Sequence, residues 1–250
     1  DLKPGSGELR FDRVSFEYPG SPEVLHDITM TIPGGTSVGL VGATGAGKTT
    51  LAHLIPRFYD ATGGSVTIDG VDVRDVRLEQ LRNEVAVVFQ ETFLFSASIE
   101  DNLRVGDPTA SDERLRSAAR LARAHEFICE LPDGYRTVVG ERGATLSGGQ
   151  RQRVGLARGV VRDPRVLILD DATSSVDAVV EAEIQEALRQ VMAGRTTVIV
   201  AHRTSTLALL DNVAFIEDGR IVAFGPHAEL LRDVPRYSEV LAAGDATVST

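Results

Sequence analysis

The chain has 250 residues, of which 42% are hydrophobic and 25% are charged, and its formal net charge at pH 7 is -10. This length and composition are typical of one large globular α/β domain, and no stretch approaches the roughly 20 apolar residues of a membrane-spanning helix. The acidic charge argues against a general nucleic-acid binder, because neutralising a phosphate backbone normally requires a basic surface.

The first third of the sequence predicts mainly strands. Residues 8–18 alternate apolar and polar side chains, the period of a half-buried antiparallel strand, and a slip near Asp12 predicts a bulge. Further strands are predicted at 24–32, 37–41, 65–68 and 85–89, and a helix at 48–55. The strand at 37–41 is apolar enough to be buried, and glycine-rich sequence follows it directly.

Helical periodicity dominates the middle of the chain. From residue 97 to about residue 162 apolar residues recur at spacings of three and four, which predicts an inserted helical lobe. Cys129, the only cysteine, falls in a helix predicted over 121–131, and we interpret it as a packed core thiol that cannot form an intrachain disulfide.

Strands and helices alternate in the last third, which is typical of an α/β fold. Strands are predicted at 166–169 and 197–200, helices at 179–192 and 204–210, and a hairpin at 213–216 and 221–224. We expect the last residues, from 244, to fray.

Residues 42–49, with the sequence GATGAGKT, match the glycine-rich phosphate-binding loop. They lie between an apolar strand and the start of a helix, where backbone N–H groups converge on phosphates. Lys48 would neutralise the terminal phosphates, and the Thr49 hydroxyl would ligate magnesium. The pattern arises by chance in about one per cent of random chains of this length, so a plain glycine turn is the weaker interpretation.

A candidate magnesium ligand ends the strand predicted at 166–169. Four apolar residues followed by Asp170 place a carboxylate at the carboxyl end of a central strand, beside the bound phosphates. Alone, such a run is more typical of a buried strand that ends in a turn residue. Together with the phosphate loop, it predicts that Asp170 holds magnesium, directly or through water.

A second candidate anion site is LSGGQ at residues 146–150, just before a helix predicted over 151–161. Ser147 is a candidate helix cap, and the unpaired N–H groups of the first turn would face an anion. Ser-Gly-Gly by itself is more often a turn. Between a phosphate loop and an apolar strand ending in Asp, however, LSGGQ resembles the signature of ABC ATPases, and the resemblance extends from about Glu8 to Leu241.

The resemblance implies an α/β fold: a P-loop (RecA-like) ATPase core with an N-terminal antiparallel β-subdomain and an inserted α-helical subdomain. It implies an ABC ATPase domain over 8–241, with the helical subdomain at about 91–162. Residues 1–7 would be a linker that follows a transmembrane domain, and 242–250 a C-terminal tail. The implied cofactors are ATP and Mg²⁺.

Further roles follow from the resemblance at matching positions. Tyr18 resembles the aromatic residue that stacks on adenine, Gln90 the glutamine that contacts magnesium and couples the helical lobe to the membrane domain, and His202 the switch histidine at the γ-phosphate. Residues 174–177 resemble the loop that crosses the dimer interface. The alternatives are a core aromatic residue for Tyr18 and a structural histidine for His202. The implied nucleotide-binding residues are Tyr18, Gly42, Ala43, Thr44, Gly45, Ala46, Gly47, Lys48, Thr49, Thr50, Gln90, Leu146, Ser147, Gly148, Gly149, Gln150, Asp177 and His202. The implied magnesium ligands are Thr49, Gln90 and Asp170, and the implied catalytic residues are Lys48, Gln90, Asp171 and His202.

Two stretches resemble exporters of the multidrug and lipid-flippase type, namely VGERG at 139–143 and FSASI at 95–99. The implied partners are a second ABC ATPase domain, which closes head to tail around ATP, and a transmembrane domain in the same polypeptide. The resemblance implies a place on the cytoplasmic face of the cell membrane and no nucleic-acid partner.

The sequence departs from the family pattern at Asp171, where a glutamate usually polarises the attacking water. The shorter side chain withdraws the carboxylate by about 1.5 Å, one carbon–carbon bond, so hydrolysis should be slow. This implies a weakened site in a heterodimer, which we favour over a homodimer that works with Asp171. Two alternatives remain: a nucleotide-binding regulatory half-site without significant hydrolysis, and a non-transport ABC ATPase of DNA repair or the ribosome.

Overall fold

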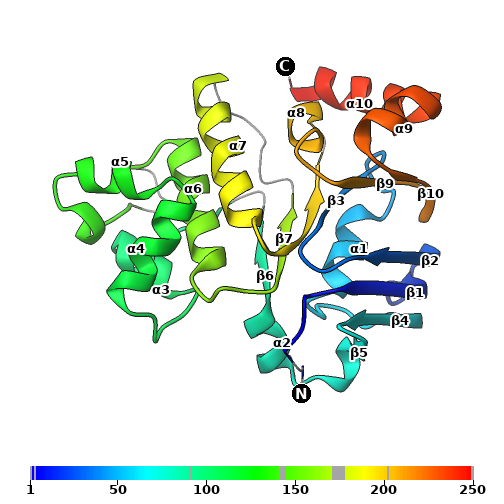
Figure 1. The fold of residues 1–250 in the computed structure, drawn as a ribbon, viewed down its shortest axis with the longest axis horizontal. Coiled ribbons are helices and arrows are strands. Elements are labelled where there is room, and N and C mark those ends of the chain that lie inside the picture. Colours follow the sequence, from blue (N-terminus) through cyan, green and yellow to red (C-terminus); the bar gives the residue numbers. More distant parts are fainter. Residues whose placement is uncertain are drawn as a thin grey trace. The chain divides into compact units, whose positions relative to one another are not determined.

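The computed structural model of the chain describes residues 2, 4–89, 92–140, 145–170, 178–201 and 203–248. The chain divides into two units, drawn together in Figure 1. The first unit comprises Asp1–Val87, Arg165–Asp171 and Gly194–Thr250, and the second comprises Val88–Pro164 and Ala172–Ala193. The candidate phosphate loop and Asp170 therefore belong to the first unit, and the LSGGQ segment belongs to the second.

One sheet of the first unit is antiparallel and has the strand order β2-β1-β4-β5. Its strands are β1 (Leu9–Glu17), β2 (Glu23–Ile32), β4 (Gly63–Ile68) and β5 (Val71–Asp72). Alternate residues of β1 are buried, as the polar–apolar alternation predicts. The pairing of β1 with β2 shifts between Phe11 and Val14, where Arg13 has a φ of 48°, so the predicted bulge is confirmed. The short strand β5 was not predicted.

The other sheet of the first unit has six strands in the order β10-β9-β3-β8-β7-β6. They are β3 (Ser37–Val41), β6 (Val85–Val88), β7 (Val166–Asp170), β8 (Thr196–Val200), β9 (Asn212–Glu217) and β10 (Arg220–Gly225). β3 and β8 are buried along their whole length, because they lie inside the sheet and parallel sheets are covered on both faces. β8 pairs in parallel with both β3 and β7, so the carboxyl ends of these three strands lie at one edge.

Short helices complete the first unit: α1 (Lys48–Leu54), α2 (Leu78–Glu84), α8 (Thr204–Leu207), α9 (His227–Asp233) and α10 (Pro235–Val248). α1 contacts β7 and β8 of the six-stranded sheet and β2 of the antiparallel sheet, which places it between the two sheets. α10 includes most of the stretch predicted as a tail from residue 242. The buried Tyr237 at its start lies with its hydroxyl 2.6 Å from Nδ1 of His227, which holds α10 against α9.

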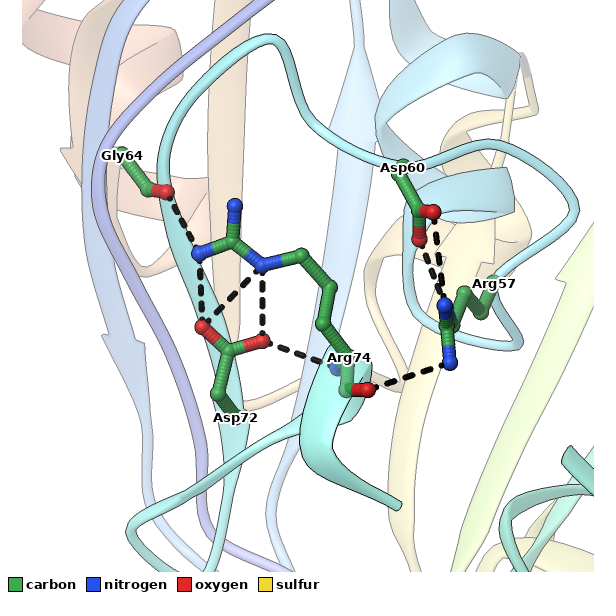
Figure 2. A network of polar contacts seen from close by, with 5 residues as sticks. All are labelled: Arg57, Asp60, Gly64, Asp72 and Arg74. Carbon is green, nitrogen blue, oxygen red and sulfur yellow. Dashed lines mark hydrogen bonds and ion pairs between the residues drawn. The ribbon is translucent and has the colours of Figure 1, made fainter. Parts of the chain in front are cut away.

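A polar network fixes the segment that follows α1 (Figure 2). Arg57 donates from Nε to Asp60 at 2.6 Å and from Nη1 to the carbonyl oxygen of Arg74 at 3.2 Å. Arg74 in turn pairs with Asp72 at 2.7 Å and donates to the carbonyl oxygen of Gly64 at 3.0 Å. Because these contacts join the segment after α1 to Arg74, and Arg74 to β4 and β5, they hold the turn at 57–60 in place.

The segment that precedes β1 is fastened to the first unit. Leu2 is buried, and Asp69 accepts hydrogen bonds from the backbone amides of Gly7 at 2.9 Å and Glu8 at 3.1 Å. Arg165 pairs with Asp69 at 2.9 Å and with Glu84 at 2.7 Å. Residues 4–8 therefore lie along the core rather than away from it.

The second unit is helical in its described parts, with α3 (Ile99–Arg104), α4 (Asp112–Leu121), α5 (His125–Glu130), α6 (Gly148–Val160) and α7 (Ala178–Met192). The single helix predicted over 121–131 is wrong, because Arg123 takes a φ of 54° and separates α4 from α5. Cys129 is exposed on α5, which also corrects its interpretation as a core thiol. None of the helices in the described ranges combines the length and the apolar character needed to cross a membrane.

Candidate functional site

The glycine-rich loop follows β3 and leads into α1. Gly47 directly precedes α1 with a φ of 98°, and a Cβ atom there would come within 2.7 Å of Leu25, so this position requires glycine. Lys48 is buried, and its Nζ donates to the carbonyl oxygens of Gly42 and Ala43, both at 2.8 Å. The ammonium group is therefore held inside the curve of the loop, while Ala43, Thr44 and Gly45 stay exposed at its crest.

Thr49 and Asp170 meet at the carboxyl edge of the six-stranded sheet. Leu40 of β3 and Asp170 of β7 both pair with Val200 of β8, so the glycine-rich loop and the carboxylate begin at the same level of the sheet. The hydroxyl of Thr49 donates to Oδ1 of Asp170 at 3.2 Å. The sequence-predicted neighbours are thus brought together.

The donor set at this edge fits magnesium. Mg²⁺ prefers oxygen ligands and is usually held by one or two carboxylates together with water and substrate phosphates. Thr49 and Asp170 supply a hydroxyl and a carboxylate oxygen. No cluster of three or more His, Cys, Asp or Glu side chains suited to a metal occurs within the described ranges, so an all-protein cage is absent from them.

A cavity of about 290 Å³ opens beside the loop. It is lined by Tyr18, Val24, Gly45, Gly47, Lys48, Thr49 and Thr50. The Tyr18 hydroxyl lies 2.9 Å from Oγ1 of Thr50, and its ring meets those of Phe16 and Tyr59 edge to face at 4.8 and 5.2 Å. Tyr18 is therefore a half-buried wall of the cavity that also packs against the hydrophobic core.

The LSGGQ segment forms the start of α6. Ser147 accepts from the backbone amide of Gln150 at 3.2 Å, and the Gln150 side chain accepts from the backbone amide of Ser147 at 2.9 Å. This capping box confirms Ser147 as the helix cap. Ser147 and Gly148 are exposed, and the first turn of α6 contains no acidic residue, so the positive end of its dipole is not neutralised locally. The side chain of Leu146, in contrast, is buried.

His53, which is not among the residues predicted from the sequence, lies next to Asp170. Nε2 of His53 is 3.7 Å from Oδ2 of Asp170, on the side opposite the Thr49 contact. One signal was present in the sequence: His53 is four residues after Thr49, the spacing that places two side chains on one face of a helix.

Several predicted site residues lie outside the described residues, namely Gln90, Asp171, Asp177 and His202. The same holds for residues 141–143 of the VGERG stretch and for the whole 174–177 loop. Their predicted roles stay predictions. Each unit thus holds described candidate residues of its own: the glycine-rich loop, Tyr18, Thr50 and Asp170 in the first unit, and the start of α6 in the second.

Comparison with known proteins agrees with this arrangement. The sequence pattern of the ABC transporter family matches residues 25–174. The chain is 44% identical over 242 residues to the uncharacterized ABC transporter ATP-binding protein YknV of Bacillus subtilis, covering 97% of this chain and 40% of YknV. It is 43% identical over 244 residues to the Beta-(1→2)glucan export ATP-binding/permease protein NdvA of Brucella suis biovar 1, covering 98% of this chain and 41% of NdvA.

A solved structure shows the same fold. It is the structure of a bacterial Atm1-family ABC exporter with ATP bound, which matches with a TM-score of 0.87 and 40% identity. The match covers 95% of this chain and 42% of that one. The chain therefore spans about two fifths of the length of these relatives.

Proposed function

The chain belongs to the ABC transporter family, and we propose that it binds ATP with Mg²⁺ and hydrolyses it as one half of a dimer that drives export across a membrane. One observation carries this proposal: Lys48, Thr49 and Asp170 converge at one edge of the sheet, beside a cavity walled by Tyr18. A structural glycine turn would require neither a carboxylate at the hydroxyl of Thr49 nor an aromatic wall across the cavity.

The residues of the cavity have different roles in binding ATP. Tyr18 is the candidate to stack on adenine, because its hydroxyl is tied to Thr50 and its side chain lines the cavity. Backbone N–H groups of the loop receive the phosphates, and Lys48 stabilises the charge that grows on the terminal phosphate as water attacks. Thr49 and Asp170 would hold Mg²⁺, with Gln90 as a further ligand. When bound, Mg²⁺ supplies positive charge to the phosphate oxygens.

The start of α6 supplies the second half of the site. We propose that the exposed Ser147 and Gly148 of one domain face the nucleotide held by a second domain, so that ATP is enclosed by two chains. The positive end of the α6 dipole supports this role. It attracts a phosphate, and the first turn of α6 has no acidic residue that would neutralise it. ATP binding would supply closure free energy and hydrolysis would reopen the pair, with Asp177 at the interface and His202 at the γ-phosphate.

The membrane partner is proposed to dock on the second unit next to Gln90. Phe93 and Phe95 follow Gln90, are about half exposed, and pack edge to face at 5.1 Å. The buried Asn102 fixes this segment, because its side chain bonds both the amide and the carbonyl of Phe95. A rigid, exposed aromatic pair is well suited to receive a helix of the transmembrane domain on the cytoplasmic face of the cell membrane. Exported cargo would be selected by that domain.

Asp171 sets the catalytic rate in this proposal. Glutamate would place its carboxylate about 1.5 Å further out, and a misplacement of about 1 Å can slow a reaction about a hundredfold. We therefore propose a weakened site whose own LSGGQ segment completes a stronger site in a different subunit. The short side chain of Asp171 also fits one alternative. In that alternative the chain is a regulatory half-site that binds ATP without hydrolysing it.

Steady-state ATP hydrolysis and an ATP titration test the proposal on three proteins: the parent, Asp171→Glu and Lys48→Ala. The parent should bind ATP and hydrolyse it slowly, and Asp171→Glu should be faster with unchanged ATP affinity. Lys48→Ala is the control that should lose binding. An Asp171→Glu protein that binds ATP but is no faster than the parent would rule out the weakened site. Fast turnover by the parent alone would point to a symmetric homodimer.

A further inference from the structure

Two side chains of α1 lie next to the two oxygens of the Asp170 carboxylate. Thr49 donates to Oδ1 of Asp170 at 3.2 Å, and Nε2 of His53 lies 3.7 Å from Oδ2. Thr49 and His53 are four residues apart and so share the face of α1 that points to β7. The carboxylate therefore has a neighbour from α1 on each side.

The imidazole of His53 is held in place by its own neighbours. Its side chain is 18% exposed, and its ring meets that of Phe58 at a centroid distance of 5.2 Å and an interplanar angle of 70°. Phe58 lies in the turn at 57–60 that Arg57 and Asp60 close (Figure 2), and the guanidinium of Arg82 covers the Phe58 ring at 5.8 Å. His53 is thus supported from behind while it faces Asp170.

The contact between His53 and Asp170 is loose. His53 presents Nε2 to the carboxylate. At 3.7 Å the contact is longer than a hydrogen bond, so it restrains Oδ2 without saturating it.

We propose that His53 is a positioning residue that orients the Asp170 carboxylate toward the magnesium ion of ATP. This inference rests on the proposed function, because it assigns His53 to the same nucleotide site. Residues that orient a metal-binding carboxylate set metal affinity without touching the metal themselves. Replacing His53 should therefore change the affinity for the metal and leave the affinity of the loop for the phosphates unchanged.

The experiment separates metal binding from nucleotide binding. ATP affinity is titrated in EDTA, and the affinity of the ATP-bound protein for Mn²⁺ is measured from the electron paramagnetic resonance signal of free Mn²⁺. His53→Leu, which keeps the bulk and removes the N–H, should weaken Mn²⁺ binding by about tenfold, at the lower end of the usual range for such residues. His53→Gln, which keeps an N–H donor, should lose less. His125→Leu, the same replacement on α5 of the second unit, is the matched control and should bind Mn²⁺ like the parent.

The outcomes distinguish this inference from the proposed function. If the parent binds no ATP in EDTA or with Mn²⁺, the proposed function fails and the inference fails with it. If the parent binds both but His53→Leu binds Mn²⁺ equally tightly, only the role of His53 is overturned. If His53→Leu does not fold, Phe58→Leu is the test. Removing the ring behind His53 should also weaken Mn²⁺ binding, and a Phe58→Leu protein that binds Mn²⁺ as tightly as the parent would contradict the inference.

Discussion

The hydroxyl groups of Tyr18 and Thr50 lie 2.9 Å apart, and this contact ties the residue after β1 to α1. Tyr18→Phe keeps the ring and should weaken ATP binding only slightly, because it loses the tie to Thr50 but not the stacking surface. Tyr18→Ala should weaken it more, because stacking an aromatic ring on a base contributes about 1–3 kcal/mol. Titration with inorganic triphosphate, which has no base, is the control: both variants should bind it like the parent. Equal losses for ATP and triphosphate would contradict the stacking role.

Removing the Thr49 hydroxyl should uncouple nucleotide binding from magnesium. We expect the parent to bind ATP more tightly with Mg²⁺ than in EDTA, and Thr49→Val to lose most of that difference, because one of the three proposed protein ligands is gone. Thr49→Ser keeps the hydroxyl and should retain the difference. ATP titrations with and without Mg²⁺ measure it. A Thr49→Val protein that responds to Mg²⁺ like Thr49→Ser would exclude Thr49 as a ligand.

Arg153 should stabilise the second unit. Its guanidinium donates to the carbonyl oxygen of Arg123 at 2.9 Å, pairs with Glu183 at 2.9 Å and covers the ring of Phe127 at 4.9 Å, while the residue is 9% exposed. Arg153→Met should lower the free energy of unfolding by about 1–3 kcal/mol, measured by urea titration, since it removes a hydrogen bond and a cation–π contact together.

The control for Arg153 is Arg189→Met on α7. Arg189 also pairs with a carboxylate, Glu186 at 3.2 Å, but both side chains are about half exposed. Exposed pairs contribute little, so the loss should stay below about 0.5 kcal/mol. Equal losses for the two variants would show that burial of Arg153 adds nothing.

Folding stability should fall in mild acid through His227. Burial lowers the pKa of His227, so the unfolded chain binds this proton at a higher pH than the folded chain. The associated stability is therefore fully present above the unfolded pKa of about 6.5 and is lost as the pH falls below it. Urea titrations on the two sides of this pH measure the effect, and His227→Gln should show a smaller drop than the parent.

Tyr237→Phe separates burial of His227 from its hydrogen bond. The variant loses the hydroxyl 2.6 Å from Nδ1, which should cost about 0.5–1.5 kcal/mol at either pH. The imidazole stays buried, however, so the dependence on pH should persist. A flat pH response in Tyr237→Phe would mean that the hydroxyl, and not burial, controls the protonation of His227.

The strands other than β5, and the approach of the glycine-rich loop to Asp170, could be predicted because each follows from local sequence. Alternation defines β1, and its slip defines the bulge at Arg13. The approach of Thr49 to Asp170 could also be predicted. Asp170 ends β7, and Thr49 lies in the first turn of α1, directly after the loop that follows β3; the carboxyl ends of parallel strands share an edge.

Other features could not be predicted, because they depend on backbone conformation or on contacts between distant segments. Ala122 and Ala124 are both buried, so apolar spacing continues across the break between α4 and α5, and only the left-handed Arg123 marks the break. The exposure of Cys129 follows from that break. The approach of His53 to Asp170 depends on how α1 packs against β7, so the four-residue spacing from Thr49 indicates a shared helix face but not this contact.

The fastening of residues 4–8 has a mechanical consequence. A force on this segment acts on the hydrogen bonds from the amides of Gly7 and Glu8 to the Asp69 carboxylate. It then acts on the ion pair between Asp69 and Arg165. Arg165 directly precedes β7, and β7 ends at Asp170. A force applied before β1 thus reaches one end of β7, and the other end of β7 carries the Asp170 carboxylate of the site.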